Sequence, residues 1–443
     1  MLNGFVYYFH RESLKMLVEF NFRNFRSFKE DVTFSMEPAS QNGREYNVIN
    51  TTLKRVNQLY YSSGIFGANA SGKSNVINAF KFLCFMVKHS SKSVVGDSFP
   101  PEFYALADGY EKVPMEFGIK FIVNSVLYDY KFSLLTNIVD KESLYSYDIS
   151  QTGTNRAKLV FDRQYIDGKM IFKKSTGILQ SWCNEVLDNR LFLSDIINNR
   201  KCELTEIKEV YDFIIRKLVV ADISMLNKGF SLNEIQEGHG KTIIDLIKKA
   251  DLGLENITVR NVSSEEIMSA FSEIKKEIPT KVKQALIAGT AKVFDTKSYH
   301  KTEAGNLKAF DFNDMESEGT ERFLSIIGPV LNSIENGKVL IVDEMDNALH
   351  PYLVRYIVDM FNNPEINKNN AQLIFASHAY YLMDGRHLTR DQIWFVDKSI
   401  NNGFSSSLYS LSDFKDILKR KNVSFKEAYM DGVYGAVPNI EDF

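Results

Sequence analysis

Residues 67–74 read GANASGKS, and this stretch decides the fold. It fits the pattern GxxxxGK[ST], in which glycines let the backbone turn its amide groups onto phosphate oxygens. In this pattern Lys73 reaches the β- and γ-phosphates of a nucleotide, and the hydroxyl of Ser74 binds Mg²⁺. We therefore expect an ATP-binding loop formed by Gly67, Asn69, Ala70, Ser71, Gly72, Lys73 and Ser74.

The segments on either side of the loop have the order that the pattern requires. Residues 59–66 predict a strand that runs into the loop, and residues 75–87 have the spacing of an amphipathic helix. The positive end of such a helix would point at the same phosphate oxygens. Further strands are predicted at residues 17–25, 32–36, 117–123, 127–134, 371–376 and 392–396.

A second motif, VLIVDE at residues 339–344, combines an apolar run with two acids. The apolar part predicts a central strand buried on both faces. Phosphoryl transfer needs a carboxylate at the end of such a strand to hold Mg²⁺, and Asp343 suits that role. Glu344 could then act as the general base for the attacking water. Alone, the motif could equally be a buried strand that ends in two solvated acids; the loop at residues 67–74 favours the chemical role.

Two further motifs gain meaning from their positions. His378 follows an apolar strand, where it could hydrogen-bond a γ-phosphate and act in catalysis. Residues 316–320 read ESEGT and precede a helix, which Ser317 could cap while Gly319 allows close backbone approach. In isolation the first would be an ordinary surface histidine and the second an ordinary helix start.

The middle of the chain has a different pattern. Residues 203–219 and 265–278 carry apolar residues at three- and four-residue steps among many Lys and Glu, as in amphipathic helices. The expected organisation is an N-terminal extension, two parts of one α/β domain, and a mostly helical insertion between those parts. The corresponding ranges are residues 1–15, residues 16–150 and 301–443, and residues 151–300.

The composition is that of an ordinary globular protein. Of 443 residues, 44% are hydrophobic and 25% are charged, and the formal net charge is −3, so no general basic field indicates nucleic-acid binding. Cys84, Cys183 and Cys202 are odd in number and widely spaced, which indicates reduced thiols. The sequence has neither an apolar run of membrane-spanning length nor the features of a signal peptide. We therefore expect a cytoplasmic protein without a membrane partner.

With these motifs in this order, the chain resembles the ABC/SMC-like ATPases, a class that includes RecF, SMC and OLD-family proteins. Residues 22–28, FRNFRSF, resemble their opening strand. Residues 343–351, DEMDNALHP, resemble their D-loop, with His350 where transporters commonly carry Asp. The resemblance implies an α/β fold: an ABC-type P-loop NTPase head, with a mixed β-sheet and flanking helices, interrupted by the mostly helical insertion.

The match is closer to compact bacterial AAA-type ATPases of abortive-infection and antiphage systems, such as RloA, AbiL-type proteins and the ATPase subunit of PARIS. The segments that carry it are SEGT at residues 317–320, RDQIWFV at 390–396, LYSLSDF at 408–414 and GVYGAVP at 432–438. The signature reads Ser-Glu-Gly-Thr, as is usual in this subgroup, and not Leu-Ser-Gly-Gly-Gln. No Q-loop glutamine can be assigned between Lys88 and Thr136.

The resemblance implies a homodimer, or a higher homo-oligomer, with ATP at the interface. Ser317 and Gly319 would contact the γ-phosphate of the nucleotide bound to the other subunit. ATP would close the heads, and slow hydrolysis would open them. The expected role is that of sensor or regulatory subunit of an antiphage system, responding to a phage-derived trigger and controlling a separate effector, a nuclease or toxin. The residues after His378 are accounted for by the closing motifs of the subgroup, so we expect no appended nuclease domain.

Two alternatives remain open at this stage. A RecF/SMC-like DNA repair or maintenance ATPase would clamp DNA between closed heads, and its binding would weaken steeply with salt. Candidate DNA contacts are Lys248, Lys249, Lys275, Lys276, Lys281 and Lys283. The interleaved Glu265, Glu266, Glu273 and Glu277 favour a solvated helix face instead. In the second alternative the nucleotide is purely structural and turnover is negligible.

Overall fold

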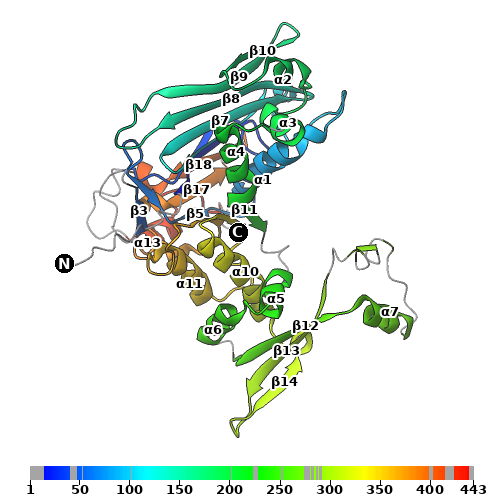
Figure 1. Ribbon diagram of the computed structural model, residues 1–443. Helices are drawn as coiled ribbons and strands as arrows, with labels where there is room; N and C mark the ends of the chain where they lie inside the picture. Colours follow the sequence, from blue (N-terminus) through cyan, green and yellow to red (C-terminus); the bar gives the residue numbers. More distant parts are fainter. Residues whose placement is uncertain are drawn as a thin grey trace, which may run out of the picture. The chain divides into compact units, whose positions relative to one another are not determined.

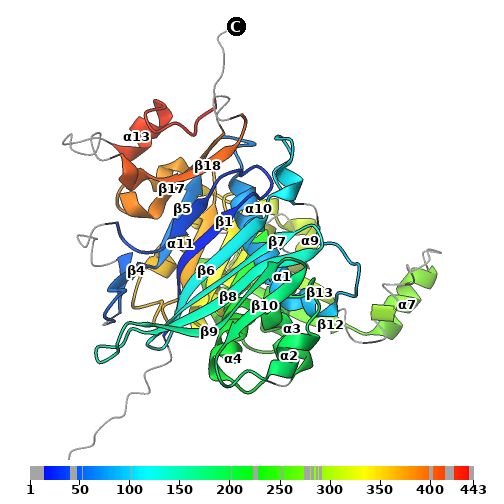
Figure 2. The same ribbon diagram turned by 90° about the horizontal axis from the view of Figure 1, so that it is seen from above.

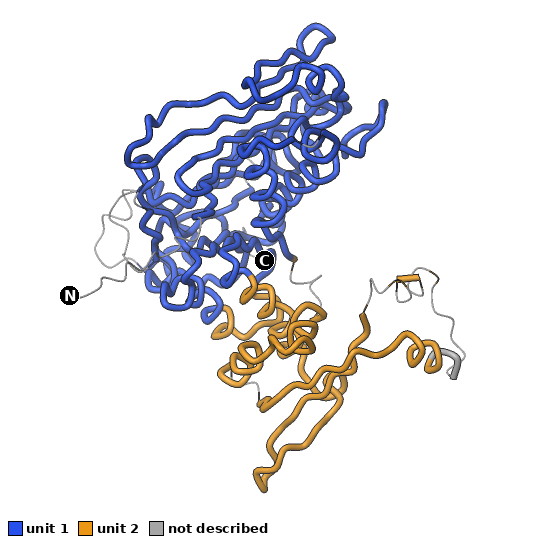
Figure 3. Tube along the Cα trace, viewed as in Figure 1, with its two compact units in different colours: residues 1–221, 333–345, 355–443 blue, residues 222–332, 346–354 orange. Residues whose placement is uncertain are grey.

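In the computed structural model the chain forms two compact units (Figure 3). Unit 1 comprises residues 1–221, 333–345 and 355–443, and unit 2 comprises residues 222–332 and 346–354. Unit 2 therefore begins well after residue 151, where we expected the insertion to start. The structure describes residues 14–39, 47–51, 53–100, 102–200, 202–222, 228–250, 253–273, 280, 284–285, 288, 292–398, 403–414 and 424–438.

An antiparallel sheet forms one layer of unit 1 (Figure 2). Its strand order is β10-β9-β8-β7-β6-β1-β2. The strands predicted at residues 17–25, 32–36, 117–123 and 127–134 all belong to it. Residues 157–174 also belong to it, as β9 and β10, although we expected them in a mostly helical segment. The bounds are β1 (Lys15–Arg23), β2 (Val32–Ser35), β6 (Met115–Val123), β7 (Val126–Leu135), β8 (Ile138–Asp148), β9 (Ala157–Ile166) and β10 (Lys169–Lys174).

A mixed sheet with the order β11-β15-β16-β5-β17-β18 forms a second layer (Figure 1). Its strands β15, β16, β5 and β17 are parallel, and β5 lies between β16 and β17, with Ser63 opposite Ile374 and Gly64 opposite Ile393. The two ends of the chain thus share one sheet, as the split motifs require. The bounds are β5 (Ser62–Phe66), β11 (Leu218–Asp222), β15 (Val339–Asp343), β16 (Gln372–Ala376), β17 (Ile393–Lys398) and β18 (Ser406–Ser410).

Helix α1 (Lys73–His89) packs against both sheets. Phe80 stacks on Phe20 of β1 with ring centroids 3.7 Å apart, and Phe82 stacks on Phe117 of β6 at 5.0 Å. The same helix contacts β15 and β16 of the mixed sheet. Apolar residues around most of its circumference are therefore buried, as expected for a helix between two layers. The predicted helix at residues 75–87 is confirmed and is slightly longer at both ends.

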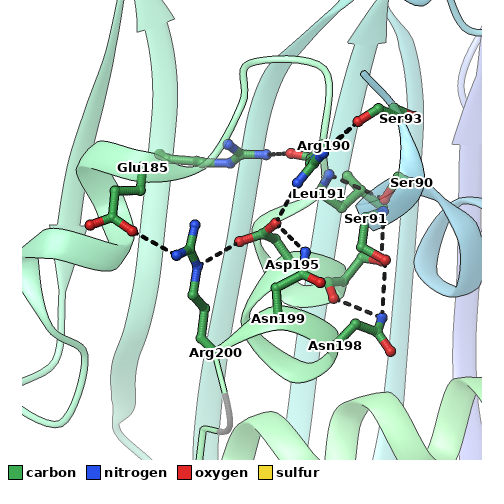
Figure 4. Close-up of polar contacts among 12 residues, drawn as sticks. Ser90, Ser91, Ser93, Glu185, Arg190, Leu191, Asp195, Asn198, Asn199 and Arg200 are labelled. Carbon is green, nitrogen blue, oxygen red and sulfur yellow. Dashed lines mark hydrogen bonds and ion pairs between the residues drawn. The ribbon is translucent and has the colours of Figure 1, made fainter. Parts of the chain in front are cut away.

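A polar network joins the end of α1 to α3 (Phe192–Asn199), the helix over the antiparallel sheet (Figure 4). Arg190 donates to the carbonyl of Ser93, with Nε 2.8 Å from that oxygen, and to Asp195 at 3.1 Å. Arg200 donates to the other oxygen of Asp195 at 3.1 Å and pairs with Glu185 at 2.6 Å. The side chain of Asp195 is only 1% exposed, and these two arginines supply the partners that compensate for its burial.

The closing motifs of the sequence form an aromatic cluster on β17. The ring of Phe395 stacks on those of Tyr429 and Tyr434, with centroids 5.4 and 5.6 Å away. The hydroxyl of Tyr409 donates to the carbonyl of Tyr434 at 2.7 Å. Other elements of unit 1 are β3 (Val48–Asn50), β4 (Gln58–Tyr60), α2 (Gln180–Glu185), α4 (Thr205–Asp212) and α13 (Phe425–Met430).

Unit 2 combines helices with a sheet of order β12-β13-β14 (Figure 1). Helix α10 (Glu318–Glu335) belongs mainly to unit 2, and α11 (Pro351–Asn362) mainly to unit 1. Residues 151–300 therefore contain several strands besides the expected helices. The remaining bounds are α5 (Gly229–Gln236), α6 (Lys241–Lys249), β12 (Asn256–Val262), α7 (Ser264–Glu273), β13 (Val293–Lys301), β14 (Leu307–Asp311) and α9 (Phe312–Met315).

Some expectations fall partly or wholly outside the described residues. Of the expected extension, residues 1–13 lie outside them, and Lys15 is already the first residue of β1. Among the helices that the structure describes, none is both long and apolar enough to cross a membrane.

Candidate nucleotide-binding site

The loop at residues 67–72 leaves the end of β5 and leads into α1. Gly67 has φ 155°, and a Cβ there would lie 2.3 Å from the carbonyl oxygen of Val396 in β17. Gly72 has φ 115°, and a Cβ there would lie 2.6 Å from the hydroxyl of Ser406. Both positions therefore need glycine because the loop is pressed against the sheet and β18.

A group of hydroxyls supports the loop from behind. The hydroxyl of Ser406 donates to the carbonyl of Ser71 at 2.5 Å and lies 2.8 Å from the hydroxyl of Ser27. Ser27 in turn accepts a hydrogen bond from the side-chain amide of Asn75 at 2.8 Å. Our sequence reasoning did not identify these positions as part of the site. Ser27 lies within residues 22–28, the segment that resembles the opening strand of ABC/SMC-like ATPases. Ser406 lies hundreds of residues from the loop, and no motif around it indicates a role in nucleotide binding.

Lys73 is only 9% exposed and lies folded against the loop. Its Nζ donates to the carbonyl oxygens of Gly67 at 2.8 Å and of Ala68 at 2.9 Å. A buried ammonium needs such acceptors, and phosphate oxygens would be stronger ones. Ser74 is exposed in the first turn of α1. The structure thus places both side chains at the positive end of the helix.

The two acids of the second motif stand at the end of β15. Asp343 is the last residue of that strand, and its carboxylate accepts a hydrogen bond from the backbone amide of Glu344 at 3.0 Å. Glu344 is exposed and has φ 51°, an unusual conformation for a residue with a side chain. Such backbone strain is common at functional sites. The amide of Met345 donates to the carbonyl of Ala376 at 3.0 Å, which joins this turn to β16.

His378 follows β16, the strand between β15 and β5. Its neighbour Ser377 is buried and donates its backbone amide to Ile65 of β5 at 3.1 Å. The carboxyl ends of these parallel strands meet at one edge, where α/β sheets bind ligands. There the structure forms a cavity of about 260 Å³, lined by Asn69, Ala70, Ser71, Gly72, Lys73, Ser74, Asn75, Asp343, Glu344, Ala376, Ser377 and His378.

The donor set of this cavity fits a magnesium-bound nucleotide phosphate. The hydroxyl of Ser71 is buried and has no hydrogen-bond partner within the described part of the chain, so a ligand oxygen could use it. Asp343 and Ser74 offer oxygen ligands, which Mg²⁺ prefers. The described residues contain no cluster of three or more His, Cys, Asp or Glu that could hold a metal alone. A site completed by phosphate oxygens and water agrees with the usual magnesium chemistry.

Ser317 and Gly319 belong to unit 2, whereas every residue that lines the cavity belongs to unit 1. Ser317 is exposed, and its hydroxyl accepts a hydrogen bond from the amide of Thr320 at 3.2 Å, as a helix cap does. A Cβ on Gly319 would lie 3.3 Å from the carbonyl oxygen of Ala348, which has φ 58°. The structure therefore brings the signature-like segment together with the D-loop-like segment.

Comparison with solved structures found remote similarities. The SMC head domain from Thermotoga maritima aligns with a TM-score of 0.37 at 12% identity, covering 89% of this chain and 98% of that one. The structure of the recombination mediator protein RecF with ATP, from the RecFOR pathway, aligns with a TM-score of 0.27 at 13% identity, covering 83% and 93%. No curated protein sequence matches this chain.

One family model covers more than half of the chain. It matches residues 62–175, which include the loop, and residues 235–384, which include the signature-like segment, the paired acids and His378. The chain belongs to the family described as "AAA domain, putative AbiEii toxin, Type IV TA system".

Proposed function

We propose that this protein is an ATPase whose protomers dimerise head to head through ATP, and that it acts as the sensor or regulatory subunit of an antiphage system. The dimer is supported by the division of the motifs between the units. Unit 1 holds a complete phosphate cavity with its acids, and unit 2 holds an exposed Ser317 beside the D-loop-like segment. An exposed serine and a backbone glycine at a helix start are suited to contact a phosphate bound to another protomer.

Each side chain of the cavity has a distinct role in this proposal. Lys73 and the loop amides would bind the phosphate oxygens, and Asp343 with Ser74 would hold Mg²⁺. The metal would neutralise charge that develops on the phosphates. Glu344 orients the attacking water and takes its proton. It suits this role because it lines the cavity next to Asp343 and its side chain is exposed to water. His378 follows β16, the strand between β15 and β5, and from there would hydrogen-bond the γ-phosphate.

The family description supports a defence setting, because it names an AbiEii toxin and a toxin–antitoxin system. The described residues after His378 form β17, β18, α13 and their aromatic cluster, all packed within the ATPase unit. We propose that a separate nuclease or toxin is the effector, and that a phage component triggers its release.

The substitution Glu344→Gln tests the switch. It keeps the shape of the side chain but removes the base, so ATP should remain bound and hold the heads together. Light scattering after gel filtration with ATP and Mg²⁺ should show a stable dimer or larger assembly for this variant and hydrolysis near background. Lys73→Ala should stay in the nucleotide-free state under the same conditions. If Glu344→Gln leaves both the oligomeric state and the bound nucleotide unchanged, the proposal is wrong.

The defence role needs a separate test in cells. We expect the native gene cluster to protect bacteria from phage, and expect Glu344→Gln or Lys73→Ala within it to change that protection. The protein expressed alone should neither protect cells nor cut nucleic acid. Copurification with ATP from the native cluster should identify the effector.

A DNA clamp would give a different result. Salt-sensitive, ATP-dependent binding of duplex DNA by the purified protein would favour it. Of the candidate lysines, Lys248 and Lys249 lie in the last turn of α6, and Glu265 and Glu266 lie in the first turn of α7. The remaining candidates, Lys275, Lys276, Lys281 and Lys283, are outside the described residues.

A further inference from the structure

The residue immediately before Ser317 makes an unusual contact. The side chain of Glu316 is only 4% exposed, and its Oε1 lies 2.8 Å from Nε2 of His300. When Glu316 is ionised it can only accept hydrogen bonds, and Nε2 of His300 is then the donor in this pair. A carboxylate buried to this degree is costly without a donor. The pair therefore fixes Glu316 and, through the backbone, the start of the signature-like segment.

His300 itself is held by the sheet of unit 2. It lies in β13, the central strand, opposite Lys308 of β14. On the other side of the strand, Glu255 donates its backbone amide to the carbonyl of Tyr299 at 2.8 Å. The ring of His300 packs edge-on against Phe310, with centroids 5.7 Å apart. The β12–β14 sheet therefore holds this imidazole in place.

An ion pair acts on the other side of the same segment. Lys228, which precedes α5, donates to Glu321 in the first turn of α10 and to Asn313 of α9, each at 2.5 Å. Its Nζ also lies 4.7 Å from the ring centroid of Phe312. The segment that contains Ser317 is thus attached to the sheet through His300 and to α5 through Lys228. Of these two attachments, the one through His300 involves the more buried acid.

We infer that His300 is a positioning residue for the ATP site shared between protomers, and that it couples the β12–β14 sheet to Ser317 and Gly319. The inference rests on the proposed function, because it needs Ser317 to face the nucleotide of a second protomer. A shift of the sheet would move the signature-like segment within unit 2, whereas every residue that lines the phosphate cavity belongs to unit 1. The sheet is thereby the element through which unit 2 regulates closure of the heads.

The test uses the full chain with Glu344→Gln, so that ATP-dependent dimerisation can be measured without turnover. Adding His300→Ala should weaken dimerisation by about tenfold, because it leaves a buried carboxylate without its donor. ATP affinity of the monomer, measured with a fluorescent analogue at low protein concentration, should stay unchanged. His300→Gln, which retains a side-chain N–H donor, should restore most of the dimerisation.

Two further variants separate positioning from a general loss of structure. Lys301→Ala is the matched control, because it removes an exposed ion pair with Glu255 from the same strand and should leave dimerisation unchanged. His300→Ala combined with Glu316→Ala should be no worse than His300→Ala alone, since it removes the stranded charge.

The outcomes separate a failure of ATP-dependent assembly from a failure of the role inferred for His300. If Glu344→Gln alone shows no ATP-dependent assembly, the proposed function fails and the inference with it. If Glu344→Gln assembles and the added His300→Ala assembles equally well, the inference is overturned while the proposed function stands. A parallel loss of monomer ATP affinity in His300→Ala would also overturn it, because the defect would then be one of folding.

Discussion

The phosphate cavity of unit 1 and the signature-like segment of unit 2 are built differently. In the cavity Lys73 is buried, two loop glycines are in tight contact with the sheet and β18, and hydroxyls of distant segments support the backbone. In the other segment Ser317 is exposed, and the His300–Glu316 hydrogen bond on one side and the Lys228–Glu321 ion pair on the other fix its position. A preorganised cavity suits tight binding, whereas a segment held by a few side-chain contacts suits a switch.

The largest effect should come from Lys73→Ala. The side chain supplies a charged donor in a buried position, so we expect ATP affinity to fall by about a hundredfold or more. Titration of the monomer with a fluorescent nucleotide measures this directly. The control is Lys81→Ala, which removes an exposed lysine from the same helix. Retention of near-normal affinity by Lys73→Ala would mean that the cavity is not the nucleotide site.

Mixing variants tests whether the two regions meet across a dimer. Lys73→Ala and Ser317→Arg should each be inactive alone, the first in ATP binding and the second in closure. Their heterodimer keeps one complete shared site, so an equal mixture should recover about a quarter of the wild-type ATPase rate if protomers pair at random. A mixture no more active than the separate variants would contradict a shared site.

A pair of glycines compares the tolerance of the two regions. Gly72→Ala adds a Cβ 2.6 Å from the hydroxyl of Ser406 at φ 115°, so we expect about 1–3 kcal/mol of destabilisation and a clear loss of ATP affinity. In Gly319→Ala the nearest atom is 3.3 Å away, and we expect less than about 1 kcal/mol and normal monomer affinity. Thermal melts and nucleotide titration give both quantities. Equal losses of stability and ATP affinity in the two variants would show that the two regions do not differ in their tolerance of a Cβ.

A smaller loss of ATP affinity than in Gly72→Ala should come from Ser406→Ala. It removes the hydrogen bond to the carbonyl of Ser71, so we expect ATP binding to weaken by about 1 kcal/mol. Ser407→Ala is the control, because the hydroxyl of Ser407 lies 3.5 Å from the carbonyl of Asp397 and supports no part of the loop. An unchanged affinity in Ser406→Ala would show that the glycine contacts alone hold the loop.

The sequence predicted the α/β architecture and the segments of the cavity because those signals are local. A glycine-rich loop between a strand and a helix, and an apolar strand that ends in two acids, can be read within a few residues. The placement of Lys73, Asp343, Glu344 and His378 around one cavity agrees with that reading, while their roles remain predictions.

Features that depend on long-range packing were missed. Strand β10 reads KMIFKK and is half exposed at the edge of its sheet, so its apolar alternation is weak. Strand β12 alternates only over Ile257 and Val259, and β13 carries polar residues on both faces, so their period-two apolar signal is short. Ser406 and His300 gain their importance only from residues that the fold brings beside them.

Strand β5 lies between two strands from the far end of the chain, with Ser63 opposite Ile374 and Gly64 opposite Ile393. The loop that follows β5 therefore leaves the ribosome long before β16 and β17, the two strands that flank β5. Contacts of such large sequence separation form slowly, since the intervening chain must first be closed into a loop. A nascent or truncated chain that contains residues 67–74 but stops before β16 should therefore bind ATP poorly, so synthesis itself delays ATP binding until β16 and β17 have been made.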